Sequence, residues 1–368
     1  MSEKKIFIIC TTDSMISSFL IPYIEAFQDL GYTVRCFCSR TGSHFDYLTD
    51  RDIDVTELPF TRNPISLSNL RAYKELKQIL EREKPDIVFC HEPVGGVMGR
   101  LVGHKVKARV IYMVHGFHFY KGAPIVNWLL FYPIEKAMSY FTDILITINK
   151  EDYAFSKKHM KAKRSEYLPG VGINTDKYKK SIDLRNDKRA SLGFSDEDLV
   201  LISVGELNEN KNHIAVLDAI HNVNDENIHY VIAGVGDTEK MLTDKAESFG
   251  LKDKLHLLGY RNDCDELYAA SDVFCFPSFR EGLSVALMEA MASSLPVIAS
   301  RIRGNVDLVR PDGGILVEPD DVVQISSAIK KMTDNGYRKS CGEFNCAVAE
   351  EYNLESVLSE FFRITGIN

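Results

Sequence analysis

The sequence predicts an α/β protein made of two doubly wound domains. Short apolar runs of strand type alternate with longer segments of helical spacing along the chain, a pattern typical of parallel sheets covered by helices. The length of 368 residues exceeds that of one ordinary α/β domain and suits two. Because the alternation breaks between residues 169 and 198, we place the connection between the domains there.

In the first half we expect six strands with helices between them. The predicted strands lie near residues 5–10, 33–38, 54–58, 86–90, 109–114 and 143–148, and the predicted helices near 16–30, 67–83, 95–105, 125–140 and 150–159. The run 86–90 is mostly apolar without alternation, as expected of a strand that is covered on both faces. We assign residues 1–178 to this N-terminal domain.

The second half repeats the pattern from Leu199 onward. Its predicted strands lie near residues 199–205, 228–233, 254–258, 272–276, 296–299 and 314–317, and helical patterns follow at 320–333, 337–350 and 354–364. We assign residues 190–345 to a C-terminal domain and expect residues 346–368 to pack back on the first domain. Two such domains are expected to face a central cleft, and such sheets bind ligands beyond the carboxyl ends of their strands.

Composition narrows the class of protein. Apolar residues make up 45% of the chain and charged residues 26%, the balance of a soluble globular protein. The net charge of -8 argues against general nucleic-acid binding. We expect no transmembrane helix and no signal peptide, because no apolar run reaches about 18 residues. The eight cysteines are scattered without a CxxC pair, as in a reduced cytoplasmic protein.

The strongest motif begins where the strand ending at Phe276 meets a loop and a helix. The loop carries Glu281 and Gly282, and the helix is expected to begin at about Leu283. Free backbone N–H groups at a helix start, together with the helix dipole, favour an anion. Gly282 permits close approach of the backbone to a ligand, and Ser284 adds a hydroxyl donor.

Two carboxylates flank this helix start. Glu281 and Glu289 are eight residues apart, and eight helical residues span at most about 12 Å. That distance suits a sugar at one end and a ribose at the other, with a diphosphate between them, because carboxylates accept hydrogen bonds from vicinal hydroxyls. The alternative is a first-turn acid at Glu281 and a solvent-facing Glu289, and the spacing alone does not separate the two interpretations.

This segment resembles the retaining glycosyltransferases of family 4, which have the GT-B fold. The resemblance rests on the Glu281 and Glu289 pair, on residues 276–278 before it and on residues 295–300 after it. It covers nearly the whole chain and is most specific from about 199 to 317. It implies that Glu281 lies by the donor sugar, that Glu289 holds the ribose, and that the amides of Gly282, Leu283 and Ser284 approach the sugar and the diphosphate.

The second motif, residues 204–213, follows a strand and opens a helix. Lys211 would place a cation where a leaving nucleoside diphosphate gains negative charge, and a fixed cation stabilises that charge selectively. The alternative is a solvated lysine in a first turn. Gly205 and Asn208 lie in the same loop, and we assign both to donor binding.

One position departs from the family. Glycosyltransferases of this type usually carry an arginine where this chain has Glu206, and a glutamate beside a diphosphate would repel it. We expect Glu206 to point elsewhere and another cation to substitute, with Arg261 and Arg303 as the two candidates. Tyr260 would border the nucleotide base, although an ordinary turn residue explains it nearly as well.

The first half contributes a histidine and an acceptor side. His115 follows an apolar strand and precedes a glycine, and similar family members have a histidine here near the donor sugar. We group His115 with Lys211 and Glu281 as catalytic. Asp13, Ser14 and His91 also follow strands and are assigned to the acceptor side. Helix capping is an alternative for Asp13 and Ser14.

The resemblance implies a reaction without a metal ion or another cofactor. No protein nucleophile is assigned, because the leaving phosphate is thought to take the acceptor proton in retaining members. DxD tripeptides occur, for example at Asp50-Arg51-Asp52, but so short a pattern arises easily by chance in an acidic chain. We therefore assign no metal ligand.

Two stretches point to a membrane surface. Residues 128–133 are apolar and aromatic, and residues 157–164 form a cationic run in an acidic chain. Such a pair of features suits contact with anionic lipid. The alternatives are an ordinary buried helix for the first stretch and a solvated face for the second. We expect a cytoplasmic location with peripheral contact at the inner face of the membrane.

The predicted function is glycosyl transfer from a nucleotide diphosphate sugar. UDP is the expected nucleotide, the transferred unit is a hexose or N-acetylhexosamine, and the acceptor is a saccharide or lipid-linked saccharide of surface polysaccharide synthesis. Two alternatives stay open: a non-hydrolysing nucleotide-sugar epimerase, which would use carboxylates as acid and base, and an inactive nucleotide-sugar-binding partner.

Overall fold

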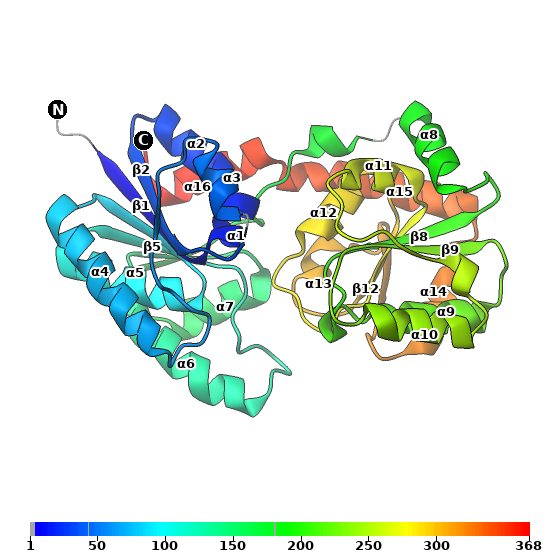
Figure 1. Ribbon diagram of the computed structural model, residues 1–368, viewed down its shortest axis with the longest axis horizontal. Coiled ribbons are helices and arrows are strands. Elements are labelled where there is room, and N and C mark those ends of the chain that lie inside the picture. The colour runs from blue at the N-terminus through cyan, green and yellow to red at the C-terminus, as the bar shows by residue number, and fades with distance from the viewer. Residues whose placement is uncertain (1–3, 43, 180–181) are drawn as a thin grey trace. The chain divides into compact units, whose positions relative to one another are not determined.

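The computed structural model describes residues 4–42, 44–179 and 182–368 (Figure 1). The chain divides into two compact units. The N-terminal unit comprises Met1–Leu168 and Leu358–Asn368, and the C-terminal unit comprises Pro169–Val357. The C-terminal unit therefore begins before, and ends after, the predicted C-terminal domain of residues 190–345.

The N-terminal unit contains a parallel sheet of seven described strands in the order β3-β2-β1-β4-β5-β6-β7. The strands are β1 (Lys5–Thr12), β2 (Thr33–Ser39), β3 (Val55–Glu57), β4 (Ile87–His91), β5 (Arg109–Val114), β6 (Ile144–Thr147) and β7 (Arg164–Tyr167). The order reverses at the β1–β4 pair, where Ile6 is in register with Ile87. Strand β4 is buried along its whole length, as its continuous apolar run predicts.

Helices cover this sheet. They are α1 (Asp13–Met15), a π-helical turn (Ile16–Leu20), α2 (Ile21–Asp29), α3 (His44–Thr49), α4 (Leu67–Glu83), α5 (Pro93–Val106), α6 (Ile125–Ser139) and α7 (Lys150–His159). Helix α5 lies close against the strands because glycines face them. A Cβ atom at Gly99 would lie 2.7 Å from the Cβ atom of Cys90, which is too close for any other residue.

The C-terminal unit repeats the design with six described strands in the order β10-β9-β8-β11-β12-β13. The strands are β8 (Leu199–Val204), β9 (Ile228–Ala233), β10 (Leu255–Leu257), β11 (Val273–Phe276), β12 (Val297–Ser300) and β13 (Gly314–Val317). The pairings between these strands are parallel, and the order reverses between β8 and β11. The prediction of two doubly wound α/β domains is confirmed.

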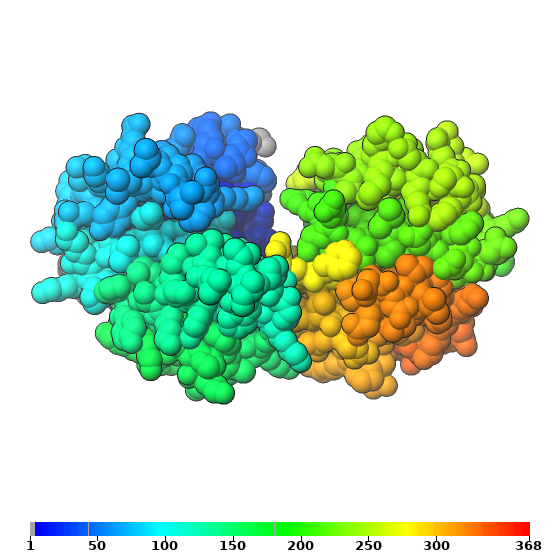
Figure 2. Space-filling model, turned by 90° about the horizontal axis from the view of Figure 1, so that it is seen from below, coloured from blue at the N-terminus to red at the C-terminus, as the bar shows by residue number. Residues whose placement is uncertain are grey.

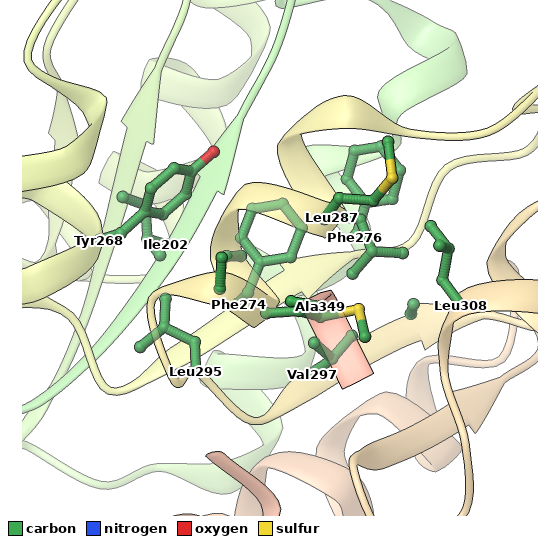
Figure 3. Close-up of a cluster of buried hydrophobic side chains, with 14 of the residues drawn as sticks. Ile202, Tyr268, Phe274, Phe276, Leu287, Leu295, Val297, Leu308 and Ala349 are labelled. Atoms are coloured by element: carbon green, nitrogen blue, oxygen red, sulfur yellow. The ribbon is translucent and has the colours of Figure 1, made fainter. Parts of the chain in front are cut away.

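The helices of this unit are α8 (Ile182–Leu192), α9 (His213–Val223), α10 (Glu239–Ser248), α11 (Cys264–Ala270), α12 (Val285–Ala292), α13 (Asn305–Leu308), α14 (Val322–Lys331) and α15 (Asn335–Ala349). Short 3-10 turns occur at Thr175–Tyr178, Glu209–Lys211, Lys252–Lys254 and Glu350–Tyr352. Figure 3 shows the apolar cluster under α12, where Leu287 lies among Phe274, Phe276 and Val297, all buried. This core fixes the helix that carries Glu289.

The last helix, α16 (Leu354–Thr365), begins in the C-terminal unit and ends in the N-terminal unit. Its Phe361 is fully buried. The Phe361 ring lies 5.1 Å from the ring of Tyr23, 5.8 Å from that of Phe27 and 5.3 Å from that of Phe89, between ring centroids. The end of the chain is thus part of the core of the N-terminal unit.

Candidate functional site

Two loops meet at the carboxyl ends of the neighbouring strands β8 and β11. The amide N–H of Phe279 donates to the Asn210 carbonyl at 2.8 Å, and the Asn210 side chain donates to the Arg280 carbonyl at 3.0 Å. The Asn212 side chain donates to the Pro277 carbonyl at 3.2 Å. These bonds hold the loop after β8 against the loop before α12, so the two sequence motifs form one site.

Lys211 and Glu281 form an ion pair at this junction. The Nζ atom of Lys211 lies 2.8 Å from Oε1 of Glu281, and the side chains are 19% and 13% exposed. Gly205 makes room for the lysine, because a Cβ atom there would lie 3.2 Å from the lysine Cε atom. The lysine also lies 4.8 Å from the Phe276 ring centroid, within reach of a cation–π contact. The structure thus brings together two predicted catalytic residues.

A second cation, Arg303, lies beside the same loop. Gly304 has a φ of +84°, and a Cβ atom there would lie 2.4 Å from the Gly282 carbonyl oxygen. Only glycine permits this backbone approach. The approach brings the buried Arg303 close to the loop that carries Glu281. The Nε atom of Arg303 donates to the Glu281 carbonyl at 3.3 Å.

The other candidate cation is committed elsewhere. Arg261 donates to Asp263 through Nε at 2.7 Å and Nη2 at 2.5 Å. Lys188 also donates to Asp263, at 2.5 Å, and the arginine contact foremost holds the pKa of that aspartate below its ordinary value. Tyr260, predicted beside the base, is 72% exposed. Of the two arginines, Arg303 is therefore the one that contacts the Glu281 loop.

Glu206 is turned toward its own loop. Its exposed carboxylate accepts from the Asn208 side chain at 2.8 Å. The same asparagine accepts from the Lys211 amide at 3.1 Å and caps the short helical turn there. Asn208 thus holds the glutamate while it shapes the turn that presents the lysine.

Helix α12 begins at Val285, two residues later than the sequence predicts. Ser284 is its N-cap, and its Oγ atom accepts from the Leu287 N–H at 3.3 Å. Leu283 packs against the core beneath the helix. The loop amides from Gly282 to Ser284 consequently precede the helix rather than belonging to its first turn, although they remain at its positive end.

Glu289 is partly buried on the inner side of α12. Its Oε1 accepts from the Tyr178 hydroxyl at 2.6 Å and its Oε2 from the Tyr268 hydroxyl at 3.2 Å. Burial raises the pKa of Glu289, and the two hydroxyls oppose that rise. The alternative of a solvent-facing carboxylate at this position is therefore wrong. Sequence reasoning missed both tyrosines, and Tyr178 lies in the stretch that it treated as a linker.

In the N-terminal unit, two histidines meet at the ends of β4 and β5. The Nδ1 atom of His91 lies 3.1 Å from Nε2 of His115. Burial lowers the pKa of His115 to about 4 and lowers that of His91 as well, with the neighbouring ring adding to the effect on His91. Both rings are therefore neutral near pH 7 and act through hydrogen bonds rather than charge.

Asp13 and Ser14 lie at the carboxyl end of β1. Asp13 is fully buried and accepts from the amides of Ser14 and Thr41, each at 2.9 Å. The Ser14 hydroxyl lies 3.0 Å from that of Thr12. These bonds give Asp13 a role in joining the loops after β1 and β2.

Glu92 binds the last two amides of β1. Its Oε2 atom accepts from the amides of Thr11 at 2.8 Å and Thr12 at 3.0 Å. The residue has a φ of +58°, which is a strained conformation for a side chain of this size. A carboxylate fills this position where a glycine-rich loop would leave its amides open to an anion.

The described parts of the chain contain neither a candidate metal site nor a candidate membrane-spanning helix. Within residues 4–42, 44–179 and 182–368, no cluster of three or more His, Cys, Asp or Glu side chains is arranged to hold a metal ion. No helix of those residues is long and apolar enough to cross a membrane.

Comparisons with known proteins place both halves in one enzyme class. The family model described as Glycosyl transferase 4-like matches residues 6–149, and the model described as Glycosyl transferases group 1 matches residues 185–345. EpsD of Bacillus subtilis (strain 168), which is named as a glycosyltransferase, is 33% identical over 337 residues, covering 89% of this chain and 87% of EpsD.

Two further proteins are similar over most of the chain. The UDP-Gal:alpha-D-GlcNAc-diphosphoundecaprenol alpha-1,3-galactosyltransferase of Escherichia coli is 29% identical, covering 83% of this chain and 81% of its own. The crystal structure of Anabaena HepE in complex with UDP and glucose has a TM-score of 0.85 at 18% identity and covers 99% of this chain and 100% of HepE. The chain is an enzyme that belongs to the GT-B glycosyltransferases, with a 4-like N-terminal domain and a group 1 C-terminal domain.

Proposed function

We propose that this glycosyltransferase transfers a sugar from a UDP-sugar to a lipid-linked saccharide, with retention, in bacterial surface polysaccharide synthesis. The name of the E. coli relative gives a UDP-sugar as donor and an undecaprenol diphosphate-linked sugar as acceptor. The HepE structure, of the same fold, holds UDP and glucose. The site of this chain supplies the groups that such a donor needs.

The observation that carries the proposal is the pair of cations that both contact Glu281. Lys211 bonds to the carboxylate of Glu281, and Arg303 bonds to its carbonyl. A diphosphate at the positive end of α12 would meet both cations and the amides of residues 282–284. In this arrangement Arg303 replaces the arginine that family members carry at the position of Glu206.

Glu289 is the ribose ligand in this proposal. A carboxylate has about four acceptor positions, and the two tyrosine hydroxyls use one on each oxygen. The remaining positions suit a vicinal diol. Glu281 faces the donor sugar, and its ion pair keeps Lys211 oriented before the donor arrives.

The reaction breaks the bond between the anomeric carbon and the terminal phosphate oxygen. A bond from the anomeric carbon to the acceptor oxygen forms on the same face, and the departing phosphate takes the acceptor proton. Lys211 and Arg303 stabilise the negative charge that grows on the phosphate. Because these side chains supply the positive charge, the proposal requires no metal ion.

The N-terminal unit contributes neutral hydrogen-bonding groups. In this proposal His115 donates to a hydroxyl of the donor sugar, and His91, 3.1 Å from it, fixes its tautomer and ring orientation. Asp13 and Ser14 lie on the acceptor side. An acceptor anchored in a bilayer implies a peripheral location on the cytoplasmic face of the membrane.

Calorimetry with UDP, GDP, ADP and CMP, in the presence of EDTA, tests the donor site. We expect UDP to bind and Arg303→Gln to weaken it at least tenfold, while Arg261→Gln, the matched arginine control, changes it less than threefold, on the scale of one lost charged contact. Equal losses in both variants would contradict the role of Arg303. Tight UDP binding without transfer to any lipid-linked saccharide would identify an inactive binding partner instead.

A further inference from the structure

Helix α6 of the N-terminal unit exposes an apolar face while it buries a glutamate. Its buried residues are Glu135 and Ser139. Its large exposed apolar residues are Ile125, Val126, Leu129, Leu130 and Ile134. Ile125 and Leu129 are 73% and 72% exposed. Surface helices normally bury such residues and expose their charges, so this face is built to meet an apolar partner.

The exposed residues form one continuous face. Ile125 and Leu129 are one helical turn apart, and Val126, Leu130 and Ile134 follow one another at the same spacing. Residues four apart stack on one side of a helix, so the five side chains make two adjacent rows. Figure 2, which views the N-terminal unit from below, shows α6 in teal-green on the surface turned to the viewer.

Buried polar contacts fix this orientation. The Nη1 atom of Arg100 on α5 lies 2.7 Å from Glu135 Oε2, and the Tyr112 hydroxyl donates to Glu135 Oε1 at 3.1 Å. The Arg100 side chain is fully buried. Rotating α6 to bury its apolar rows would expose Glu135 and leave Arg100 unpaired in the interior, which is strongly unfavourable.

Positive charge predominates in the part of the chain that contains α6. Residues 121–164, which include α6, contain eight Lys and Arg residues but four Asp and Glu residues, in a chain of net charge -8. The Lys161 amide donates to the Ser139 hydroxyl at 2.8 Å. That bond places the cationic run 157–164 beside the C-terminal end of α6. Lys121 is exposed four residues before the helix begins.

A second apolar area lies at the start of α4. Ile65, Leu67 and Leu70 are exposed there, and with Met98 and Leu101 of α5 they line a groove of about 430 Å³. Helix α5 packs against both α4 and α6. Two of the three neighbouring helices thus carry exposed apolar residues.

We infer that the apolar face of α6, with the lysines near its two ends, binds the surface of an anionic lipid bilayer. Apolar side chains would enter the headgroup region while the lysines contact lipid phosphates. The charge favours lipid over a second copy of the chain, because a self-paired face would bring like charges together. This membrane contact rests on the proposed function, which places the acceptor in a bilayer. The position of the surface follows from the exposure and charge of α6.

Sedimentation with lipid vesicles tests this inference. The full chain is mixed with vesicles of phosphatidylcholine containing about one third phosphatidylglycerol, a composition that supplies anionic charge. We expect the wild type to bind, and Ile125→Ser/Leu129→Ser to weaken binding at least tenfold. Val323→Ser is the matched control, since Val323 in the C-terminal unit is also 72% exposed, and it should bind as the wild type does.

A second pair of measurements separates charge from apolar contact. Lys157→Gln/Lys158→Gln should weaken binding several-fold to the anionic vesicles and leave the weak binding to pure phosphatidylcholine vesicles unchanged. Equal sedimentation of the wild type and Ile125→Ser/Leu129→Ser would overturn the inference. A wild-type dimer in light scattering that this double variant converts to a monomer, without vesicle binding, would assign the face to a second copy instead.

The same samples keep this inference separate from the donor proposal. UDP affinity should be the same in Ile125→Ser/Leu129→Ser and the wild type. Vesicle binding without UDP binding would remove the donor proposal alone, and UDP binding without vesicle binding would remove the membrane surface alone.

Discussion

Two apolar helices each carry one glutamate on their inner side, and the partners of these glutamates differ. Glu135 on α6 bonds to the guanidinium of Arg100. Glu289 on α12 bonds only to uncharged hydroxyls among the described hydrogen bonds, those of Tyr178 and Tyr268. A carboxylate paired with a buried cation is already neutralised, whereas one held by two hydroxyls keeps free positions that can accept further hydrogen bonds. The first arrangement anchors a helix, and the second suits a ligand.

The largest expected effect concerns the anchoring glutamate. Glu135→Gln should lower the free energy of unfolding of the N-terminal unit by about 3–5 kcal/mol, because it leaves Arg100 without its charge partner in the interior. Urea denaturation measures this loss. Glu25→Gln, at an exposed position, is the control and should change it by less than about 0.5 kcal/mol. If Glu135→Gln lost no more stability than the control variant, the pair of Glu135 and Arg100 would not hold α6.

Substitutions of apolar residues in the two helices should differ almost as much in their effect on the free energy of unfolding. Leu287→Ala in α12 removes a fully buried side chain and should lower the free energy of unfolding of the C-terminal unit by about 3 kcal/mol. Leu129→Ala in α6 should change that of the N-terminal unit by less than about 0.5 kcal/mol. Similar losses in the two variants, measured by urea denaturation, would mean that the face of α6 is covered by protein.

For the ligand-type glutamate, activity should change more than stability. Glu289→Ala and Lys211→Ala should each lower kcat/KM of transfer at least tenfold, or about 1.4 kcal/mol. Lys240→Ala, which removes an exposed lysine paired with Asp244, is the control and should leave it unchanged. Wild-type kinetics in both site variants would remove the donor site from this part of the fold.

The smallest expected effect is a pH dependence of the free energy of unfolding that arises from Glu289. Burial raises its pKa in the folded state above the ordinary 4.5, so the folded protein binds this proton more tightly than the unfolded chain does. As pH rises from about 4.5 through the raised pKa, the wild type should lose stability relative to Glu289→Gln, by about 1.4 kcal/mol for each pH unit that separates the folded and unfolded pKa values. Paired unfolding curves between pH 4 and 7 measure this. A constant difference between the two proteins would contradict it.

Much of the fold could be predicted because buried parallel strands are continuous apolar runs. Strand β7, Arg164-Ser165-Glu166-Tyr167, was missed because it is an edge strand of polar, partly exposed residues. Helix α8 was missed because its charged segment reads as a linker, although Arg189 in it is buried against Asp272. Neither element has an apolar pattern that a sequence reading could detect.

The site was partly predictable for a related reason. Lys211 and Glu281 each follow a buried strand, and neighbouring parallel strands bring such loops together. The Tyr178 contact with Glu289 joins residues 111 positions apart, and no local pattern reports it. The choice between Arg261 and Arg303 depends on the close approach of Gly304 to Gly282, which exists only in the folded chain.

Helix α6 shows the limit of apolar periodicity. Its run of apolar residues is compatible with two interpretations, a buried helix and a membrane contact. Trp128 and Phe131 pack inward against the core, while Leu129 and Leu130 between them are exposed. A helix that is apolar on several sides gives no signal of which side faces the protein. The buried Glu135 decides it, and its partner Arg100 is 35 residues away.

The last helix imposes an order on the folding of this protein during its synthesis. The aromatic cluster of Tyr23, Phe27 and Phe89 is completed by Phe361. A ribosome makes the first three long before the last, so the N-terminal unit must wait for the whole C-terminal unit before its core closes. During that interval the uncovered rings are exposed apolar surface, which favours aggregation. A shortened chain that lacks Leu358–Asn368 would leave that surface uncovered permanently.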